Sequence, residues 1–111
     1  MTIHNHEDQV QQTSDTHHSG AELIGPPQGA VNGYSIGIAI YFRDTYNEPG
    51  IHDDQEGFYV VEGTGQARVG DEEFDIRPGS AFMVAPGVLH SIKRDPASGP
   101  VKLVWSHGPV A

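Results

Sequence analysis

From residue 34 onward, apolar side chains alternate with small or polar ones over short stretches. A period of two is typical of β-strands that bury one face. The clearest case is the stretch 34–42, in which Ile36, Ile38, Ile40 and Phe42 share one face, and we expect this face to pack in a core. Further short strands are predicted at 58–61, 66–69, 74–76, 81–85, 90–93 and 101–105.

Turn-forming residues separate these stretches. Asn-Glu-Pro-Gly at 47–50 and the Pro-Gly pairs at 78–79 and 86–87 each interrupt regular structure. Gly-Asp-Glu-Glu at 70–73 lies between two short apolar runs and predicts a hairpin. No segment carries a helical period over three turns. Short strands with a turn signal about every 8–12 residues predict an all-β sandwich or barrel.

The N-terminal segment has a different texture. Residues 1–22 contain few sizeable aliphatic side chains, no aromatic residue and no Lys or Arg. Such a composition buries too little apolar surface to offset the entropy of ordering the chain. We therefore expect a flexible, disordered tail over 1–22 and one barrel domain over 23–111. The tail's histidines could bind metal loosely, although we favour an incidental role for them; they are His4, His6, His17 and His18.

Charge and composition narrow the class of protein. The chain has 111 residues, with 15 acidic and 6 basic side chains, a formal net charge of -9 and no cysteine. This length suits a single domain. The acidic balance argues against nucleic acid and anionic membranes as partners, and the lack of cysteine excludes disulfides and thiolate metal sites. With no long apolar run, we expect a soluble cytoplasmic protein.

Three residues could carry metal chemistry: His52, Glu56 and His90. Imidazole and carboxylate are ligands that suit Zn, Mn, Fe, Ni or Cu. In a straight strand, residues four apart lie about 13 Å from each other, which is too far for one ion. Proline and glycine at 49–50 and Gly57 leave no room for a helix. His52 and Glu56 can therefore share a site only if the chain bends between them, in a turn through residues 53–55.

The same region resembles the cupin family. Residues 50–65 read GIHDDQEGFYVVEGTG and are similar to the first cupin motif, in which His-x-His precedes a Glu and a Gly. Residues 79–90 read GSAFMVAPGVLH and are similar to the second motif, which ends in His. The resemblance covers roughly residues 34–105. It implies a jelly-roll β-barrel, or double-stranded β-helix, that holds one divalent transition metal inside through His52, Glu56 and His90. It also implies a homodimer, because cupins commonly dimerise.

The match departs from the usual motif at one ligand. The spacing from Glu56 makes His52 the second His of the pair, and Gly50 stands where the first is expected. An alternative register makes His52 the first and Asp54 the second, but Glu56 then follows too soon. Asp54 or Glu48 could supply a replacement oxygen. Two His and one carboxylate otherwise form a set with open positions for substrate or oxygen.

Two functions follow from this resemblance. The first is a metal-dependent enzyme that acts on a small polar metabolite as a dioxygenase, isomerase, decarboxylase or lyase, with Glu56 doubling as a catalytic proton carrier. The alternative is a non-catalytic cupin that binds a small molecule in the same pocket. We favour the enzyme.

Other residues have simpler interpretations. His107, near the C-terminus, is expected to be exposed and not a ligand. Several apolar residues are expected to line the core or the pocket; they are Phe58, Val60, Phe82, Met83, Ile92 and Trp105.

Overall fold

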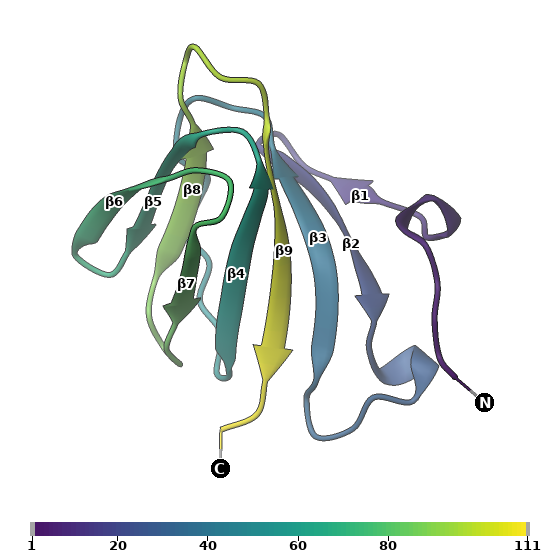
Figure 1. Cartoon of the computed structure of the whole chain (residues 1–111). Helices are drawn as coiled ribbons and strands as arrows, with labels where there is room; N and C mark the ends of the chain where they lie inside the picture. The colour runs from purple at the N-terminus through teal and green to yellow at the C-terminus, as the bar shows by residue number, and fades with distance from the viewer. Residues whose placement is uncertain (1, 111) are drawn as a thin grey trace.

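The computed structural model describes residues 2–110, and within them the secondary structure is almost entirely β (Figure 1). Two 3-10 turns, η1 (Glu7–Gln9) and η2 (Pro26–Gln28), flank the first strands. The strands are β1 (Thr13–Ser14), β2 (His18–Ile24), β3 (Ser35–Tyr41), β4 (Gln55–Glu62), β5 (Gly65–Val69), β6 (Glu72–Ile76), β7 (Ala81–Val84), β8 (His90–Arg94) and β9 (Val101–Gly108). No helix among the described residues has the length and apolar character needed to cross a bilayer.

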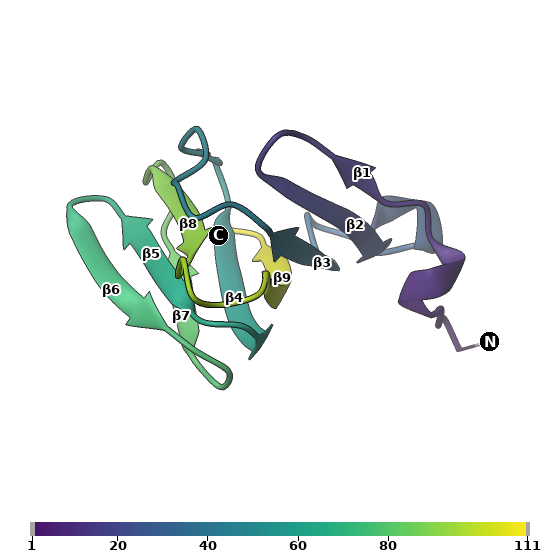
Figure 2. The ribbon, with the colours of Figure 1, turned by 90° about the horizontal axis from the view of Figure 1, so that it is seen from above.

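The strands form two antiparallel sheets that face each other (Figure 2). The larger sheet has the order β1-β2-β3-β9-β4-β7, and the smaller has the order β6-β5-β8. β9, the last strand of the chain, lies between β3 and β4. This return of the chain to the middle of the sheet is typical of jelly rolls. The predicted all-β jelly-roll fold is confirmed.

The core lies between the inward faces of the two sheets. Val60 of β4, Ala67 of β5, Val101 and Leu103 of β9 and Ile92 of β8 are at most 1% exposed. Each strand contributes alternate residues to this layer, because successive side chains point to opposite faces of a sheet. Phe58 and Ile92, predicted as core, are buried, while Phe82 and Trp105 are partly buried against the core.

The isoleucine-rich face of β3 is buried only in part: Ile38 is 3% exposed but lies outside the main core cluster, and Ile36 and Ile40 are half-buried. The core cluster takes Ala39 and Tyr41 from the opposite face of β3. A Cβ at Gly37 would overlap the Ala21 carbonyl and the indole of Trp105, so the inward face needs small residues at this point. The alternation of β3 was predicted correctly, but the size of its side chains did not indicate which face contacts the core cluster. On that face the large side chain comes from Trp105 of the neighbouring strand β9.

Met83 is a second difference. It was predicted to lie in the core or pocket, but it is 60% exposed, because β7 points its alternate residues Phe82 and Val84 inward. Met83 instead lies on the outer face of the larger sheet, near Tyr59, which is 51% exposed.

The N-terminal segment also differs from the expected flexible tail over 1–22. Met1 lies outside the described residues, but residues 18–24 form β2, which pairs with β3, and β1 pairs with β2 in turn. The contacts that hold this segment are largely polar: ladder hydrogen bonds to β3, and an ion pair of 2.8 Å between Lys102 Nζ and Glu7 Oε1. Composition did not predict this order because a strand that joins a sheet gains main-chain hydrogen bonds whatever its side chains.

Candidate metal centre

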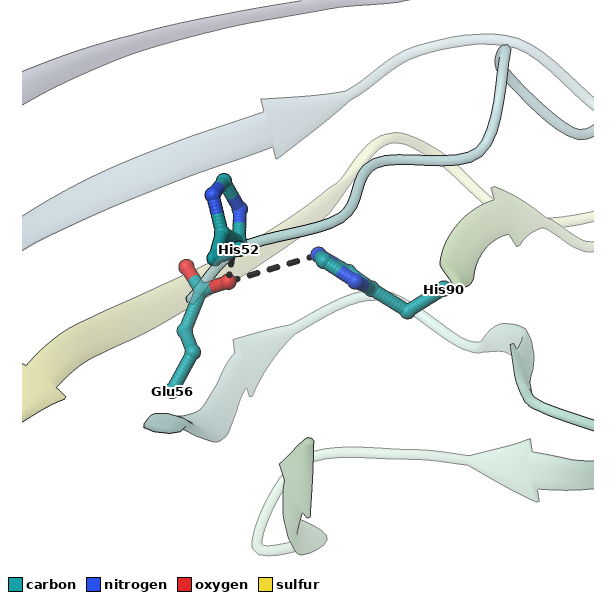
Figure 3. A group of neighbouring side chains, drawn as sticks. All are labelled: His52, Glu56 and His90. Carbon is teal, nitrogen blue, oxygen red and sulfur yellow. Dashed lines mark ion pairs between the residues drawn. The ribbon is translucent and has the colours of Figure 1, made fainter. Parts of the chain in front are cut away.

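The structure brings His52, Glu56 and His90 together from three separate elements (Figure 3). His52 lies in the loop before β4, Glu56 is the second residue of β4, and His90 begins β8 of the opposite sheet. The chain bends at residues 53–54, as the spacing required. One nitrogen or oxygen of each side chain lies within 4.8 Å of the others.

Main-chain hydrogen bonds hold the His52 loop and the start of β8 in place. The Gly87 N–H donates to the His52 carbonyl at 2.8 Å, which ties the loop to the turn at 86–87. Gly50 and His90 exchange a pair of N–H···O bonds of 2.9 and 3.0 Å. The site therefore stands on paired backbone from both sheets, which favours a fixed ligand geometry.

The carboxylate of Glu56 is the centre of the cluster. Its side chain is only 7% exposed, and its Oε1 lies 3.4 Å from His52 Nε2 and 3.3 Å from His90 Nε2. Despite this proximity, Oε1 is a buried atom without a hydrogen-bond partner among the described residues. A buried carboxylate oxygen without a partner is costly and calls for an explanation.

A divalent cation would supply that explanation. Two imidazole nitrogens and one carboxylate oxygen, aimed at the same point, form a donor set for Zn, Mn, Fe, Ni or Cu. The cation would satisfy the carboxylate oxygen, and both imidazoles would bind it through Nε2. The residues present therefore fit a metal ion.

Gly50 leaves the cluster without a side chain at the position where the motif usually has its first His. A Cβ built at position 50 would lie 3.4 Å from His90 Nε2 and 3.9 Å from His52 Nε2, so this position faces the cluster directly. The motif register that placed Gly50 at the usual first His therefore agrees with the geometry. Glycine leaves the space beside the two imidazoles free for a small molecule.

His107 was expected to be exposed, but its side chain is only 17% exposed and contacts the cluster. Its Nε2 lies 3.1 Å from Glu56 Oε2, and its Nδ1 lies 3.0 Å from Asp54 Oδ1. The strand register places His107 directly opposite Glu56. The period of two in β9 could have indicated that His107 points inward, since it falls on the same face as Leu103 and Trp105. Asp54, considered as a replacement ligand, instead bonds to His107.

The cluster opens into a cavity of about 590 Å³ between the sheets. One wall comes from the N-terminal hairpin, where the His18 ring stacks on Tyr41 with centroids 4.9 Å apart. Burial, reinforced by the nearby charge of Glu56, raises the pKa of Tyr41. Phe58 and Trp105 supply apolar surface. The described lining includes carboxylates but no Lys or Arg.

The sequence profile of the cupin domain matches residues 44–107, more than half of the chain. The chain belongs to the cupin family. The predicted family is thus confirmed, and the matched cupin segment contains His52, Glu56, His90 and His107. A search among curated proteins finds no significant match.

Solved structures with this fold include enzymes. The polyketide cyclase RemF from Streptomyces resistomycificus is 20% identical, with a TM-score of 0.79 over 96% of this cupin and 80% of RemF. An RmlC-like cupin from Shewanella frigidimarina is 16% identical, with a TM-score of 0.79 over 99% and 93% of the two chains. HppE, crystallised with Fe(II), is 18% identical, with a TM-score of 0.78 over 96% of this chain but only 60% of HppE. At these identities the likeness establishes the fold.

Proposed function

We propose that this cupin is a metal-dependent enzyme that binds a divalent transition metal through His52, Glu56 and His90. The observation that supports the proposal is the buried Glu56 Oε1, which has no hydrogen-bond partner yet lies within 3.4 Å of two imidazole nitrogens. HppE, which shares the fold, has been crystallised with Fe(II).

The bound metal supplies Lewis acidity or, as Fe(II), a site for oxygen. The protein's own residues divide the remaining work. Gly50 leaves space at the cluster for a substrate oxygen. Phe58 and Trp105 line the cavity and exclude water from one side of the substrate. Glu56, the only carboxylate among the three ligands, is the group that we assign to carry a proton.

We further infer that the substrate is a small polar metabolite without a phosphate. Phosphates are usually held by Arg or Lys, and the described lining of the cavity has neither. Asp15, Glu22 and Glu48 make the lining acidic, which favours a molecule rich in hydroxyl groups, because a carboxylate accepts the hydrogen bond that a hydroxyl donates. The choice among dioxygenase, isomerase, decarboxylase and lyase chemistry follows from the metal and from substrate screening.

The proposal is tested by metal content. Protein carrying no affinity tag, with His4 and His6 replaced by alanine to remove exposed tail imidazoles, is expected to hold about one equivalent of Fe, Mn, Zn, Ni or Cu by mass spectrometry. The same protein with His90→Ala is expected to hold almost none. A lack of metal in the parent protein, even after reconstitution, would refute the metalloenzyme.

The alternative function is a cupin that binds the small molecule without turnover. The three-ligand set favours it, because a site with open positions also suits simple capture of a ligand. A binder would show ligand-dependent thermal shifts and no metal-dependent turnover of any candidate.

We also propose that the protein is a homodimer formed through the outer face of its larger sheet. Tyr59 and Met83 are 51% and 60% exposed there, on neighbouring strands, and Ile36 lies on the same face. Light scattering on a sizing column is expected to give twice the chain mass for wild type and the chain mass for Tyr59→Lys. Val31→Lys, at a similarly exposed apolar residue outside the strands, is the control and should remain dimeric. A monomeric wild type would contradict the proposal.

A further inference from the structure

We propose that His107 is a positioning residue, and that the chain of contacts Asp54–His107–Glu56 holds the Glu56 carboxylate in its metal-binding orientation. This inference rests on the proposed metal site and deepens it. His107 lies on β9, far in sequence from the histidines of the two cupin motifs.

The two oxygens of Glu56 have different surroundings. Oε1 faces His52 and His90 and has no hydrogen-bond partner, whereas Oε2 lies 3.1 Å from His107 Nε2. Rotation of the carboxylate would lose the contact at Oε2. His107 therefore fixes the plane of the carboxylate, so that one oxygen faces the two motif histidines.

His107 is itself fixed from behind. Its Nδ1 contacts both oxygens of Asp54, at 3.0 and 3.1 Å, and its ring meets the edge of Trp105 with centroids 5.3 Å apart. The ring therefore lies between two carboxylates, with Nδ1 against Asp54 and Nε2 against Glu56. Partners of this kind, one step behind a ligand, orient it and raise metal affinity, typically 10–100-fold.

Geometry favours this role over direct ligation. The group of side chains whose donor atoms all lie within 4.8 Å of one another, among the described residues, is His52, Glu56 and His90. His107 is outside this group and instead lies on the far oxygen of the carboxylate.

The test measures Co(II) affinity and the visible absorption of the Co(II)-loaded protein for a set of full-length variants. His107→Ala is expected to bind Co(II) roughly 10–100-fold more weakly, with an altered absorption band. His107→Gln keeps an N–H donor for Glu56 and should recover most of the affinity. Asp54→Asn should lose affinity by a smaller factor, while Asp53→Asn, at the exposed neighbouring residue, should match wild type.

Three outcomes would overturn the inference. His107→Ala with wild-type affinity and spectrum would show that His107 does not position Glu56. A loss in His107→Gln as large as that in His107→Ala would indicate a direct ligand. Equal losses of Co(II) affinity in Asp54→Asn and Asp53→Asn would show that Asp54 acts only through its negative charge and not through its contact with His107.

A metal-free measurement separates this inference from the proposed function. The melting temperatures of His107→Ala, Glu56→Gln and the double variant, all in chelator, are expected to depart from additivity by several degrees, because residues in contact are energetically coupled. If wild type binds no metal but this coupling is present, the proposed function is wrong, while the positioning of Glu56 by His107 is supported. Additive shifts would overturn the positioning role itself.

Discussion

Replacing Glu56 with glutamine is expected to lower the affinity for divalent metal by more than about a hundredfold, a larger loss than removal of an outer partner usually causes. The same change should leave the metal-free protein as stable as wild type, or more stable by about 1 kcal/mol. The two effects have opposite signs because the buried Oε1 without a partner destabilises the metal-free fold but is available to bind a cation. A glutamine amide N–H at this point can donate to an acceptor nitrogen of an imidazole nearby.

Calorimetric titration with Zn, Mn and Fe(II) measures the first effect, and urea unfolding in chelator measures the second. Glu62→Gln is the matched control, since Glu62 is an exposed glutamate on the same strand, and it should change neither quantity. Loss of both metal affinity and metal-free stability in Glu56→Gln would instead make the carboxylate a structural group whose contacts to the histidines stabilise the fold.

The clustering of His52, Glu56 and His90 could be predicted from the sequence because their spacing is local and tied to turns. Proline and glycine at 49–50 and the acidic pair at 53–54 forced the bend that brings His52 and Glu56 together. The second motif ends at His90, where a strand begins in the opposite sheet. What made the prediction possible was the order of two motifs, each of which sits at a turn.

His107 could not be placed in the same way, since its position follows from strand pairing. β9 pairs with both β3 and β4, and only this register sets His107 opposite Glu56. A pairing partner many residues away leaves no mark in local sequence. The alternation of β9 indicates which face His107 shares, but not which residue it meets.

The predicted face of β3 is only partly buried, with Ile38 3% exposed but Ile36 and Ile40 half-buried, for a related reason. Bulk normally indicates burial, and Ile36 and Ile40 are bulky. Inside this barrel, however, Trp105 from the neighbouring strand occupies the space beside Gly37. The ordered hairpin of residues 13–24 likewise depends on a partner, because β2 needs the edge of β3. Each of these differences is a case in which a long-range contact outweighed local composition.

Replacing Leu103 with alanine is expected to destabilise the protein by about 2–5 kcal/mol, the range for a large-to-small change in a packed core. Leu103 is 0% exposed and lies in the middle of the larger sheet, with Ala39 on one side and Val60 on the other. Both neighbours are fixed by strand pairing, so little can move to fill the cavity. Against a typical total stability of about 5–15 kcal/mol, this loss is a large fraction.

The matched control is Leu89→Ala, because Leu89 is 52% exposed and its main-chain carbonyl, which accepts from Gly70, is kept. Its expected cost is within about 0.5 kcal/mol. Thermal or urea unfolding in chelator compares the two variants without a contribution from bound metal. The comparison also bears on the site, since Leu103 shares its strand face with His107. If the Leu103→Ala protein unfolds at a much lower urea concentration or temperature but binds metal normally while folded, core packing determines stability and local contacts determine the geometry of the site. Equal costs for the two leucines would mean that the space between the sheets is not the core that the burial pattern describes.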